Sequence, residues 1–441
     1  MIAMIAMKAT VALTPPIVTV PSTATYRKKK KNMKRKDPLQ IMKHLVCIIV
    51  GIYSLSIVMT DLCVIIDHNG ENIAVNEDEE EDEVVKAIIK SKEMHTNHPP
   101  CIVTEDHIVD ICFHPERDII AVATMAGDVQ MYKYSNTENK LVSNIELHLK
   151  ACRDIEFNQD GTTLYSTAKD LSIMLTDVET EKLIRLYENA HEQPVYTLTV
   201  IGQHTFATGD DDGVVKFWDL RQEGTMPVFS IKKMEDYVSA IVTTRDAKFL
   251  ACSSGDGSLT TFNIPEKKMY IQSEEYDEEL ICLGLFKHER KLLTATSKGK
   301  MYMFNWGEFG LHSDEFPNLT KKSINCMIPI TETIVITGGE DGMLRATSLY
   351  PHRHLGIVGQ HDLSVEVLDV SKDGSLIASS SHNNDLKFWN VEYFETLHVE
   401  ERVKGGKQKQ MKHNLPSSKV NNASDFFLCK CNEIPCANIQ K

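Results

Sequence analysis

Apolar and turn-forming residues follow one another along the middle of this 441-residue chain in a pattern that recurs seven times. In the stretch DDDGVVKFWDL (210–220), Asp212-Gly213 is a turn dipeptide and an apolar run follows it at once. Asp-Gly favours a two-residue hairpin turn, because glycine adopts positive φ without steric cost. Similar turn residues precede comparable runs at Gly127, Gly257, Gly299, Gly342 and Asn384, whereas Leu171 at the remaining place does not suit such a turn.

The spacing of these turns is nearly constant. An aromatic residue stands at five of the seven places that lie three positions after the first apolar residue of each run. A fixed period of this length indicates one supersecondary unit that is repeated along the chain. The first apolar residues recur every 42 to 44 positions, at Val129, Ile173, Val215, Leu259, Met301, Leu344 and Leu386.

Each repeat predicts four short strands. Two β-rich runs precede the turn, as in VYTLTV (195–200) and TFATG (205–209), and a weaker fourth run such as MPVFSI (226–231) comes after the turn's own strand. In the last repeat the candidate fourth strand is ETLHVEE (395–401). Runs such as MYMF (301–304) are apolar on both faces and must be covered twice. Residues 101–402 are therefore predicted to form an all-β, seven-bladed β-propeller.

The third repeat resembles the WD-repeat family. Trp218-Asp219 is a literal Trp-Asp pair, and family blades often carry a hydrogen-bonded tetrad of His, Ser or Thr, Asp and Trp. The resemblance implies that His191, Thr208, Asp212 and Trp218 form this tetrad. A buried carboxylate needs such partners, because its desolvation is otherwise uncompensated.

The seventh repeat offers a variant of the same tetrad. His361, Ser379, Asn383 and Trp389 supply it, with Asn383 in the place of the acid. The other repeats are degenerate: Asp170, Asp256 and Asp341 keep the acid, but Thr176, Phe262 and Thr347 stand in the tryptophan places.

The resemblance can be narrowed by longer motifs. HLKACRDIEF (148–157), ATGDDDGVVKFWDLR (207–221), FNWGEFG (304–310), INCMIPITE (324–332), LKFWN (386–390) and SDFF (424–427) are similar to the WD repeat-containing protein 55 family, over about residues 100–427. This resemblance implies a nuclear and nucleolar factor that meets pre-ribosomal proteins during ribosomal RNA production and ribosome biogenesis, and the cytoplasm is left open as an additional location. Residues 1–58 and 428–441 do not resemble the family, and a start at Met59 would restore its usual layout.

The ends of the chain differ in composition from the repeats. The extension 1–100 holds a basic run at 27–36, an apolar segment at 44–66 and an acidic run at 77–83, and the tail 403–441 is basic. Such polar tracts do not build a core and are expected to be disordered. The basic runs are either import signals, contacts for RNA phosphates or solvated flanks. The formal net charge of −14 argues against non-specific coating of nucleic acid, so proteins are the expected partners.

The apolar segment raises the alternative of a membrane-anchored platform. Its clean run, 44–59, ends before Asp61 and is shorter than the roughly 20 residues that span a bilayer. An anchor with its basic flank in the cytosol would also place the repeats and their cysteines across the membrane. A membrane association is therefore not the favoured hypothesis.

The motif WDLR (218–221) suggests a second alternative function. In some WD-repeat proteins, a motif of this form docks on the adaptor of cullin–RING ubiquitin ligases, and the resemblance makes Trp218, Asp219 and Arg221 candidate adaptor contacts. The chain would then be a substrate receptor. The plain alternative is that Arg221 is an exposed arginine in a turn, since short motifs match often by chance.

No pattern in the chain indicates catalysis, a cofactor or a metal. Phosphate-loop, H-E-x-x-H and G-x-S-x-G motifs are missing, and the polar residues recur at equivalent repeat positions, which indicates structural roles. Cys429, Cys431 and Cys436 are one ligand short of a zinc site. The remaining strand-borne cysteines fit buried thiols in a reducing compartment: Cys112, Cys152, Cys252, Cys282 and Cys326. The sequence thus predicts a non-catalytic interaction scaffold.

Overall fold

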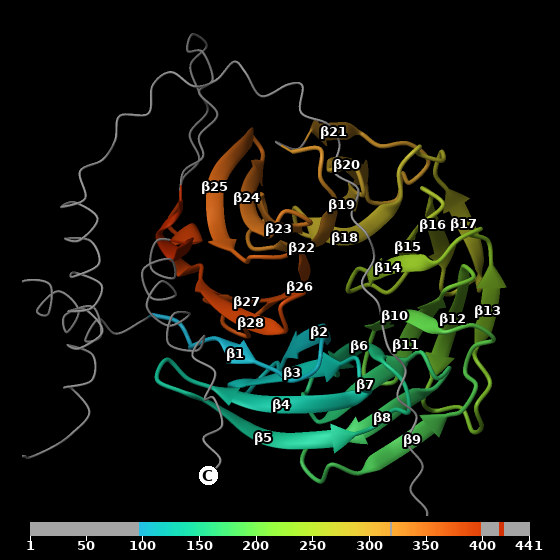
Figure 1. Cartoon of the computed structure of the whole chain (residues 1–441). Coiled ribbons are helices and arrows are strands. Elements are labelled where there is room, and N and C mark those ends of the chain that lie inside the picture. The colour runs from blue at the N-terminus through green and yellow to red at the C-terminus, as the bar shows by residue number, and fades with distance from the viewer. Residues whose placement is uncertain (1–96, 318–319, 398–413, 419–441) are drawn as a thin grey trace, which may run out of the picture. The chain divides into compact units, whose positions relative to one another are not determined.

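The computed structural model describes residues 97–317, 320–397 and 414–418. Within them, 28 strands form seven four-stranded sheets arranged around one axis (Figure 1). All neighbouring strands in these sheets are antiparallel. The prediction of an all-β, seven-bladed propeller is confirmed. The basic, apolar and acidic segments of the N-terminal extension, and most of the basic tail, lie outside the described residues.

The strands of each blade follow one another from the axis outwards. The first strands are β2 (Ile108–Phe113), β6 (Cys152–Phe157), β10 (Val195–Val200), β14 (Val238–Thr243), β18 (Leu280–Phe286), β22 (Ile324–Pro329) and β26 (Val365–Val370). The second strands are β3 (Ile119–Thr124), β7 (Thr163–Ala168), β11 (Thr205–Asp210), β15 (Phe249–Ser254), β19 (Lys291–Thr296), β23 (Ile334–Gly339) and β27 (Leu376–Ser381).

The outer half of each blade is built in the same way. The third strands are β4 (Asp128–Tyr134), β8 (Ile173–Asp177), β12 (Val214–Asp219), β16 (Leu259–Asn263), β20 (Lys300–Asn305), β24 (Met343–Leu349) and β28 (Asp385–Asn390). The outer strands of blades 1 to 6 are β5 (Asn139–Glu146), β9 (Leu183–Tyr187), β13 (Phe229–Lys232), β17 (Lys268–Gln272), β21 (Asp314–Pro317) and β25 (His352–Gln360). A short 3₁₀ helix, η1 (Glu392–Phe394), follows β28.

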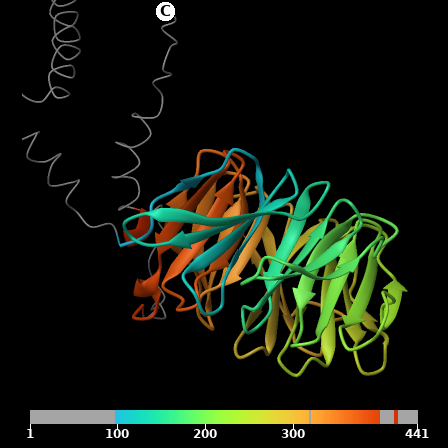
Figure 2. The ribbon, with the colours of Figure 1, turned by 90° about the horizontal axis from the view of Figure 1, so that it is seen from below.

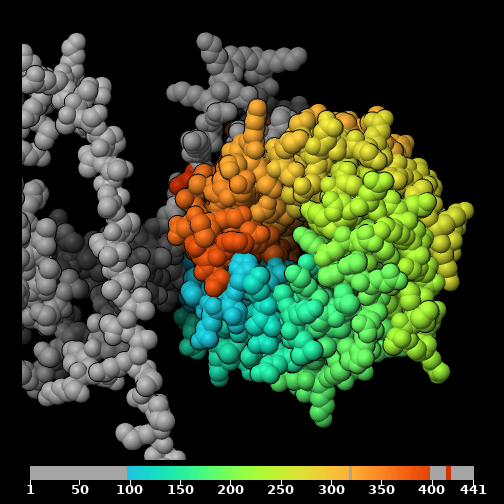
Figure 3. Space-filling view, turned by 45° about the vertical axis from the view of Figure 1, so that its right-hand side comes forward, coloured from blue at the N-terminus to red at the C-terminus, as the bar shows by residue number. Residues whose placement is uncertain are grey.

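The ring has two faces, which the alternation of strand direction defines. Face A carries the turns between second and third strands, such as 211–213, and the connections from each outer strand to the next blade. Face B carries the connections between first and second strands, such as 158–162, and between third and outer strands, such as 220–228. Figure 2 shows the strands running between the two faces, and Figure 3 shows the hollow at the centre where the blades meet.

Blade 7 is completed by the other end of the propeller. The two-residue strand β1 (Ile102–Val103) pairs with β28, with Ile102 opposite Leu386, and the backbone N–H of Thr104 donates to the Asn384 oxygen at 3.0 Å. The prediction that ETLHVEE forms this outer strand is wrong: residues 395–397 form no strand, and 398–401 lie outside the described residues. The reason is that a noncovalent ring closes by overlapping its two ends, whereas a pattern read in chain order assigns every outer strand to the repeat before it.

The turn at Leu171 has the same geometry as its counterparts. Leu171 has φ 72°, close to Gly213 at 76° and Asn384 at 60°, and its N–H donates to Ala168 as that of Gly213 does to Asp210. At Gly213 a Cβ atom would lie only 2.4 Å from the Met234 oxygen, so glycine is required there. At Leu171 the chain accepts a left-handed leucine, at a cost of about 1–2 kcal/mol. The misfit in the pattern therefore lies in the residue type and not in the fold.

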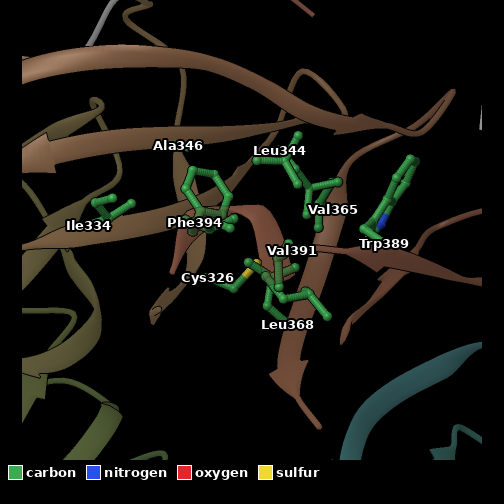
Figure 4. Close-up of a cluster of buried hydrophobic side chains, with 12 residues drawn as sticks. Cys326, Ile334, Leu344, Ala346, Val365, Leu368, Trp389, Val391 and Phe394 are labelled. Atoms are coloured by element: carbon green, nitrogen blue, oxygen red, sulfur yellow. The ribbon is translucent and has the colours of Figure 1, made fainter. Parts of the chain in front are cut away.

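The hydrophobic core is divided into seven clusters, and each cluster joins two neighbouring blades. Figure 4 shows the cluster between blades 6 and 7, where Leu344 and Ala346 of β24 meet Val365, Leu368 and Trp389 of blade 7. Each fully buried side chain of this size contributes about 1.5–3 kcal/mol. The blades are therefore stable through their neighbours and not as separate sheets.

Among the described residues, no helix has the length and apolar character needed to cross a membrane. The apolar segment 44–66 was not part of that search, because it lies outside the described ranges.

Candidate functional site

A buried chain of hydrogen bonds links four side chains of blade 3. The Nε1 of Trp218 donates to Thr208 Oγ1 at 2.9 Å, and that hydroxyl lies 2.7 Å from His191 Nε2. His191 Nδ1 lies 2.8 Å from Asp210 Oδ2. Since a carboxylate only accepts, Nδ1 carries the imidazole proton and Nε2 accepts from Thr208. Burial lowers the pKa of His191 while Asp210 acts to raise it, so the ring is neutral near pH 7.

The acid of this chain is Asp210, so the prediction of Asp212 was wrong. Asp212 lies in the exposed turn and pairs with Lys232. Asp210 ends β11 two residues after Thr208, and alternate residues of a strand share a face, so both point toward His191. Its other oxygen accepts the N–H groups of Asp212 and Val214 at 3.0 and 2.9 Å, which fixes the turn. The predicted His191, Thr208 and Trp218 are brought together as expected.

Blade 7 contains the second tetrad, again with a different acid. Trp389 Nε1 donates to Ser379 Oγ at 2.7 Å, Ser379 Oγ lies 2.6 Å from His361 Nε2, and His361 Nδ1 lies 3.1 Å from Asp385 Oδ1. Asn383, the predicted substitute for the acid, is exposed in the turn and is not part of the tetrad. Asp385 begins the third strand, so the carboxylate reaches the histidine from the opposite side of the hairpin to Asp210.

Blade 2 holds a related network of four side chains, centred on His148, that the sequence analysis missed. His148 Nε2 lies 2.9 Å from Ser166 Oγ, and its Nδ1 lies 3.2 Å from Asp170 Oδ2 and 3.0 Å from Ser172 Oγ. Although burial acts to raise it, hydrogen bonds from His148 and Ser172 hold the pKa of Asp170 well below its ordinary value. Thr176, in the tryptophan place, leaves its hydroxyl buried without a partner among the described residues. The signal was present, since His148 precedes His191 by one repeat period.

Two other blades use the turn acid in different ways. In blade 6, Asp341 forms a two-point ion pair with Arg345, at 2.9 and 2.6 Å, and no histidine takes part in it. In blade 4, Asp256 accepts the backbone N–H groups of Glu235 and Ser258 at 2.9 and 2.8 Å. Asp256 and Asp341, which both precede the turn glycine, therefore share one role. Each forms hydrogen bonds that hold the face A turn against its own blade.

The WDLR motif divides into a buried and an exposed part. Trp218 is only 1% exposed, so its side chain cannot contact a partner. The prediction that Trp218 is an adaptor contact is therefore wrong. Arg221 is exposed on face B, and its Nε and Nη2 donate to the two Asp219 oxygens at 2.9 and 2.7 Å. Arg185 of blade 2 donates to the Leu220, Gln222 and Gly224 oxygens at 2.6–2.8 Å. The neighbouring blade thus holds the loop that presents Arg221.

Acidic side chains line the channel in blades 7, 1 and 2. Each accepts a backbone N–H from the first strand of the next blade, and we call these contacts the channel bonds. A first strand pairs along one edge only, so its other N–H groups need acceptors. The channel bonds run from Phe113 to Asp369 (2.6 Å), from Ile155 to Asp110 (2.7 Å), from Leu198 to Asp154 (2.7 Å) and from Val200 to Glu156 (2.8 Å).

Uncharged side chains bridge other blades in the same region. The Thr199 hydroxyl donates to the Ile241 oxygen at 3.0 Å, the Ser239 hydroxyl to the Leu280 oxygen, and the Asn325 amide to the Val365 oxygen at 3.0 Å. The acids of the channel bonds are thus a local feature of blades 7, 1 and 2, whereas uncharged side chains join blade 3 to 4, blade 4 to 5 and blade 6 to 7.

Burial changes the titration of the channel acids. It raises the pKa of Asp154 to about 6, of Asp369 to about 7 and of Glu156 to about 8, although backbone N–H groups act to lower all three. The pKa of Asp110 is also well above its ordinary value, because of burial and the nearby charge of Asp154. These carboxyl groups therefore hold their protons to higher pH than exposed ones do.

A cavity of about 280 Å³ opens at the face B end of these strands. Two of the channel acids, Asp369 and Glu156, line it together with the Cys112 thiol and the side chains of Asn158 and Gln159. Phe113 and Phe157 form apolar walls. The mouth of the channel on face B is therefore a polar recess with titratable groups at its floor, the kind of position where a propeller can hold a side chain of a partner.

Five of the described cysteines lie on first or second strands of the blades and form no disulfide. Cys152, Cys252 and Cys326 are buried and Cys112 and Cys282 are half-buried, close to the expectation of buried thiols. Burial raises the pKa of Cys282 to about 12 and that of the other four also, so these thiols are poor nucleophiles. Among the described residues, no group of His, Cys, Asp and Glu has a metal-binding arrangement; Cys429, Cys431 and Cys436 lie outside them.

Comparison with known proteins identifies relatives of the whole propeller. A family model described as WDR55 matches residues 99–394. A protein named WD repeat-containing protein 55 homolog from Aedes aegypti is 55% identical over 352 residues, which cover 80% of this chain and 75% of the relative. Proteins of the same name from Drosophila erecta and Drosophila melanogaster are each 51% identical over 354 residues, which cover 80% of this chain and 70% of the relative.

Replacing the central hydroxyl of the blade 3 tetrad should destabilise the propeller. Thr208→Val keeps the volume but leaves Trp218 Nε1 and His191 Nε2 buried without a partner, at a cost of about 2–4 kcal/mol. Chemical denaturation followed by tryptophan fluorescence would measure the loss. Thr208→Ser should recover most of it, and Asp212→Ala, in the exposed turn, should change the free energy of unfolding by less than about 0.5 kcal/mol. Equal losses in Asp212→Ala and Thr208→Val would contradict the tetrad described here.

Removing the charge of Glu156 should change how stability depends on pH. Its folded pKa, about 8, lies above its ordinary value of 4.5, so the stability it contributes is complete below pH 4.5 and is lost as pH rises through 8. Glu156→Gln keeps the acceptor for Val200 and removes this loss. Relative to the natural chain, the variant should gain on the order of 2 kcal/mol between pH 5 and pH 9.

Unfolding curves at several pH values would test this expectation. The control Glu138→Gln makes the same substitution in an exposed turn that is remote from the channel, and it should not reproduce the gain of Glu156→Gln. A Glu156→Gln curve parallel to that of the natural chain would show that Glu156 is not protonated in the fold.

Proposed function

Because the chain belongs to the WDR55 family, we propose that its propeller is a nucleolar interaction scaffold that serves ribosomal RNA production and ribosome biogenesis. A WD-repeat propeller of this family is a protein-interaction scaffold, and the family match over residues 99–394 is the observation that carries the proposal. The nucleolar setting and the pre-ribosomal partners are the further step that we propose here.

The distribution of polar groups supports a binding role in place of a catalytic one. The predicted tetrad histidines, His191 and His361, form hydrogen bonds inside their blades. Their ring nitrogens bond to a hydroxyl, that of Thr208 or Ser379, and to a carboxylate of the same blade. The loops, the outer strands and the mouth of the channel remain exposed on the ring. A scaffold of this kind binds through such loops, because the blades hold them in place. The formal net charge of −14 favours protein partners over bare RNA.

Affinity purification of the tagged full chain from nuclear extract, with and without ribonuclease, tests the proposal. Pre-ribosomal proteins should be recovered in both samples if the propeller contacts proteins directly, and fluorescence microscopy should place the chain in the nucleolus. A tagged, unrelated propeller serves as the control. Recovery of no pre-ribosomal protein in either sample, or exclusion from the nucleolus, would contradict the proposal.

A second candidate function is that of a substrate receptor for a cullin–RING ubiquitin ligase. The observation that favours it is the geometry of the WDLR loop: Arg221 is 68% exposed, and three hydrogen bonds from Arg185 hold its loop in one conformation. A guanidinium presented on a fixed loop matches carboxylates or carbonyl oxygens of a partner, because its planar donors bond in pairs.

Pull-down of the ligase adaptor separates the two candidates. Arg221→Ala should lower recovery of the adaptor at least tenfold and leave recovery of pre-ribosomal proteins unchanged, since about 1.4 kcal/mol of lost binding is a tenfold effect. Arg245→Ala is the matched control, because Arg245 is also exposed and also pairs with an acid, Glu289. Equal adaptor recovery with Arg221→Ala and with the control would eliminate the receptor role.

A further inference from the structure

A short segment from the C-terminal part of the chain lies against the outer edge of blade 6. Asn414 forms a parallel bridge with Ile357 of β25, and the N–H of Leu415 donates to the Ile357 oxygen at 2.8 Å. A helical turn begins at Pro416, a residue suited to a first helical position because its fixed φ is already helical. The segment returns to the ring from blade 7 by way of residues 398–413, which lie outside the described ranges.

Side chains of the segment complete the contact. Leu415 packs against the apolar cluster of blades 6 and 7, as Leu355 and Tyr393 also do. The Ser417 hydroxyl donates to the Val358 oxygen at 2.8 Å and lies 3.0 Å from the Tyr393 hydroxyl. Ser417 is only 4% exposed. Leu415 and Ser417 thus face the surface formed by β25 and η1, while Pro416 between them is exposed; we call this surface the β25 groove.

The propeller does not need this segment to close. The ring closes through β1 and β28, and β25 already pairs with β24 along its other edge. The groove contact itself is limited to one short segment, through the backbone and side chain of Leu415 and the buried Ser417 and Ser418. Covalent connection to blade 7 compensates for this, since it makes binding of the segment an intramolecular step. A contact of this size is therefore one that a second peptide with the same residues could replace.

We propose that the β25 groove is a docking site for short peptides in which an apolar residue is followed by proline and a serine or threonine, and that residues 414–418 occupy it in cis. A partner that carries such a peptide binds by displacing the segment. The apolar residue enters the position of Leu415, and the hydroxyl donates to the Val358 oxygen. The proposal concerns the rim of the ring, so it stands independently of the channel mouth and of the Arg221 loop.

Binding of the segment in trans tests the proposal. The probe is a fluorescein-labelled peptide of residues 411–420, MKHNLPSSKV, and the protein is the full chain in which Leu415→Asp empties the groove by placing a charge in an apolar position. Fluorescence anisotropy should show saturable binding to this variant, at least tenfold tighter than to the natural chain. The same peptide with Leu415→Ala should bind the variant at least tenfold more weakly.

Two further variants make the result decisive. Ser417→Ala in the chain removes one hydrogen bond of the cis segment and should tighten peptide binding about threefold, so it replaces Leu415→Asp should that variant unfold at a lower temperature than the natural chain. Leu149→Asp, at a leucine that is 94% exposed on another blade, should bind the peptide no better than the natural chain. Absence of saturable binding to both groove variants, or equal binding of the Leu415→Ala peptide, would overturn the proposal.

Discussion

The mutual covering of blade faces is the constraint on which this structure depends. Every cluster of buried apolar residues joins two adjacent blades, so each sheet obtains its core from its neighbours. An open row of such sheets would expose two apolar faces at its ends, and closure into a ring removes both of them. The closing strand β1 has only two residues, but it brings Ile102 into the cluster between blades 7 and 1. A small overlap of the two ends thus seals the whole ring.

Closure creates a second demand at the axis. The first strands pair on one side only, and their remaining N–H groups meet the next blade in a confined space. In blades 7, 1 and 2, carboxylates accept hydrogen bonds from these N–H groups. Such bonds are strong, but burying a carboxylate in its charged form is costly. The raised pKa values of Asp369 and Glu156 are the consequence of this compromise. The same compromise places titratable groups at the floor of the face B recess.

The repeat period predicted the fold because strand and turn signals need only local sequence. The resemblance to the WD-repeat family implied which histidines, hydroxyls and tryptophans of blades 3 and 7 meet, and the structure brings these residues together. The acids of these two tetrads were assigned wrongly. Asp210 and Asp385 reach their histidines from opposite strands of the hairpin. Their places in the repeat do not distinguish them from the turn residues Asp212 and Asn383. The β1 closure and the docking of Leu415 join segments far apart in the chain, so no local pattern predicted them.

The departures from repetition are the informative part of this propeller. A feature present in every blade is explained by the demands of the ring, as the seven clusters and the turns of face A show. A feature present once is not required by those demands. The pinning of the Arg221 loop by Arg185 and the occupied β25 groove are such features, and both lie on the outside of the ring, where they contribute little to closure. Selection for stability alone does not account for them, so the outer rim of blades 2, 3 and 6 is where recognition by partners is to be sought.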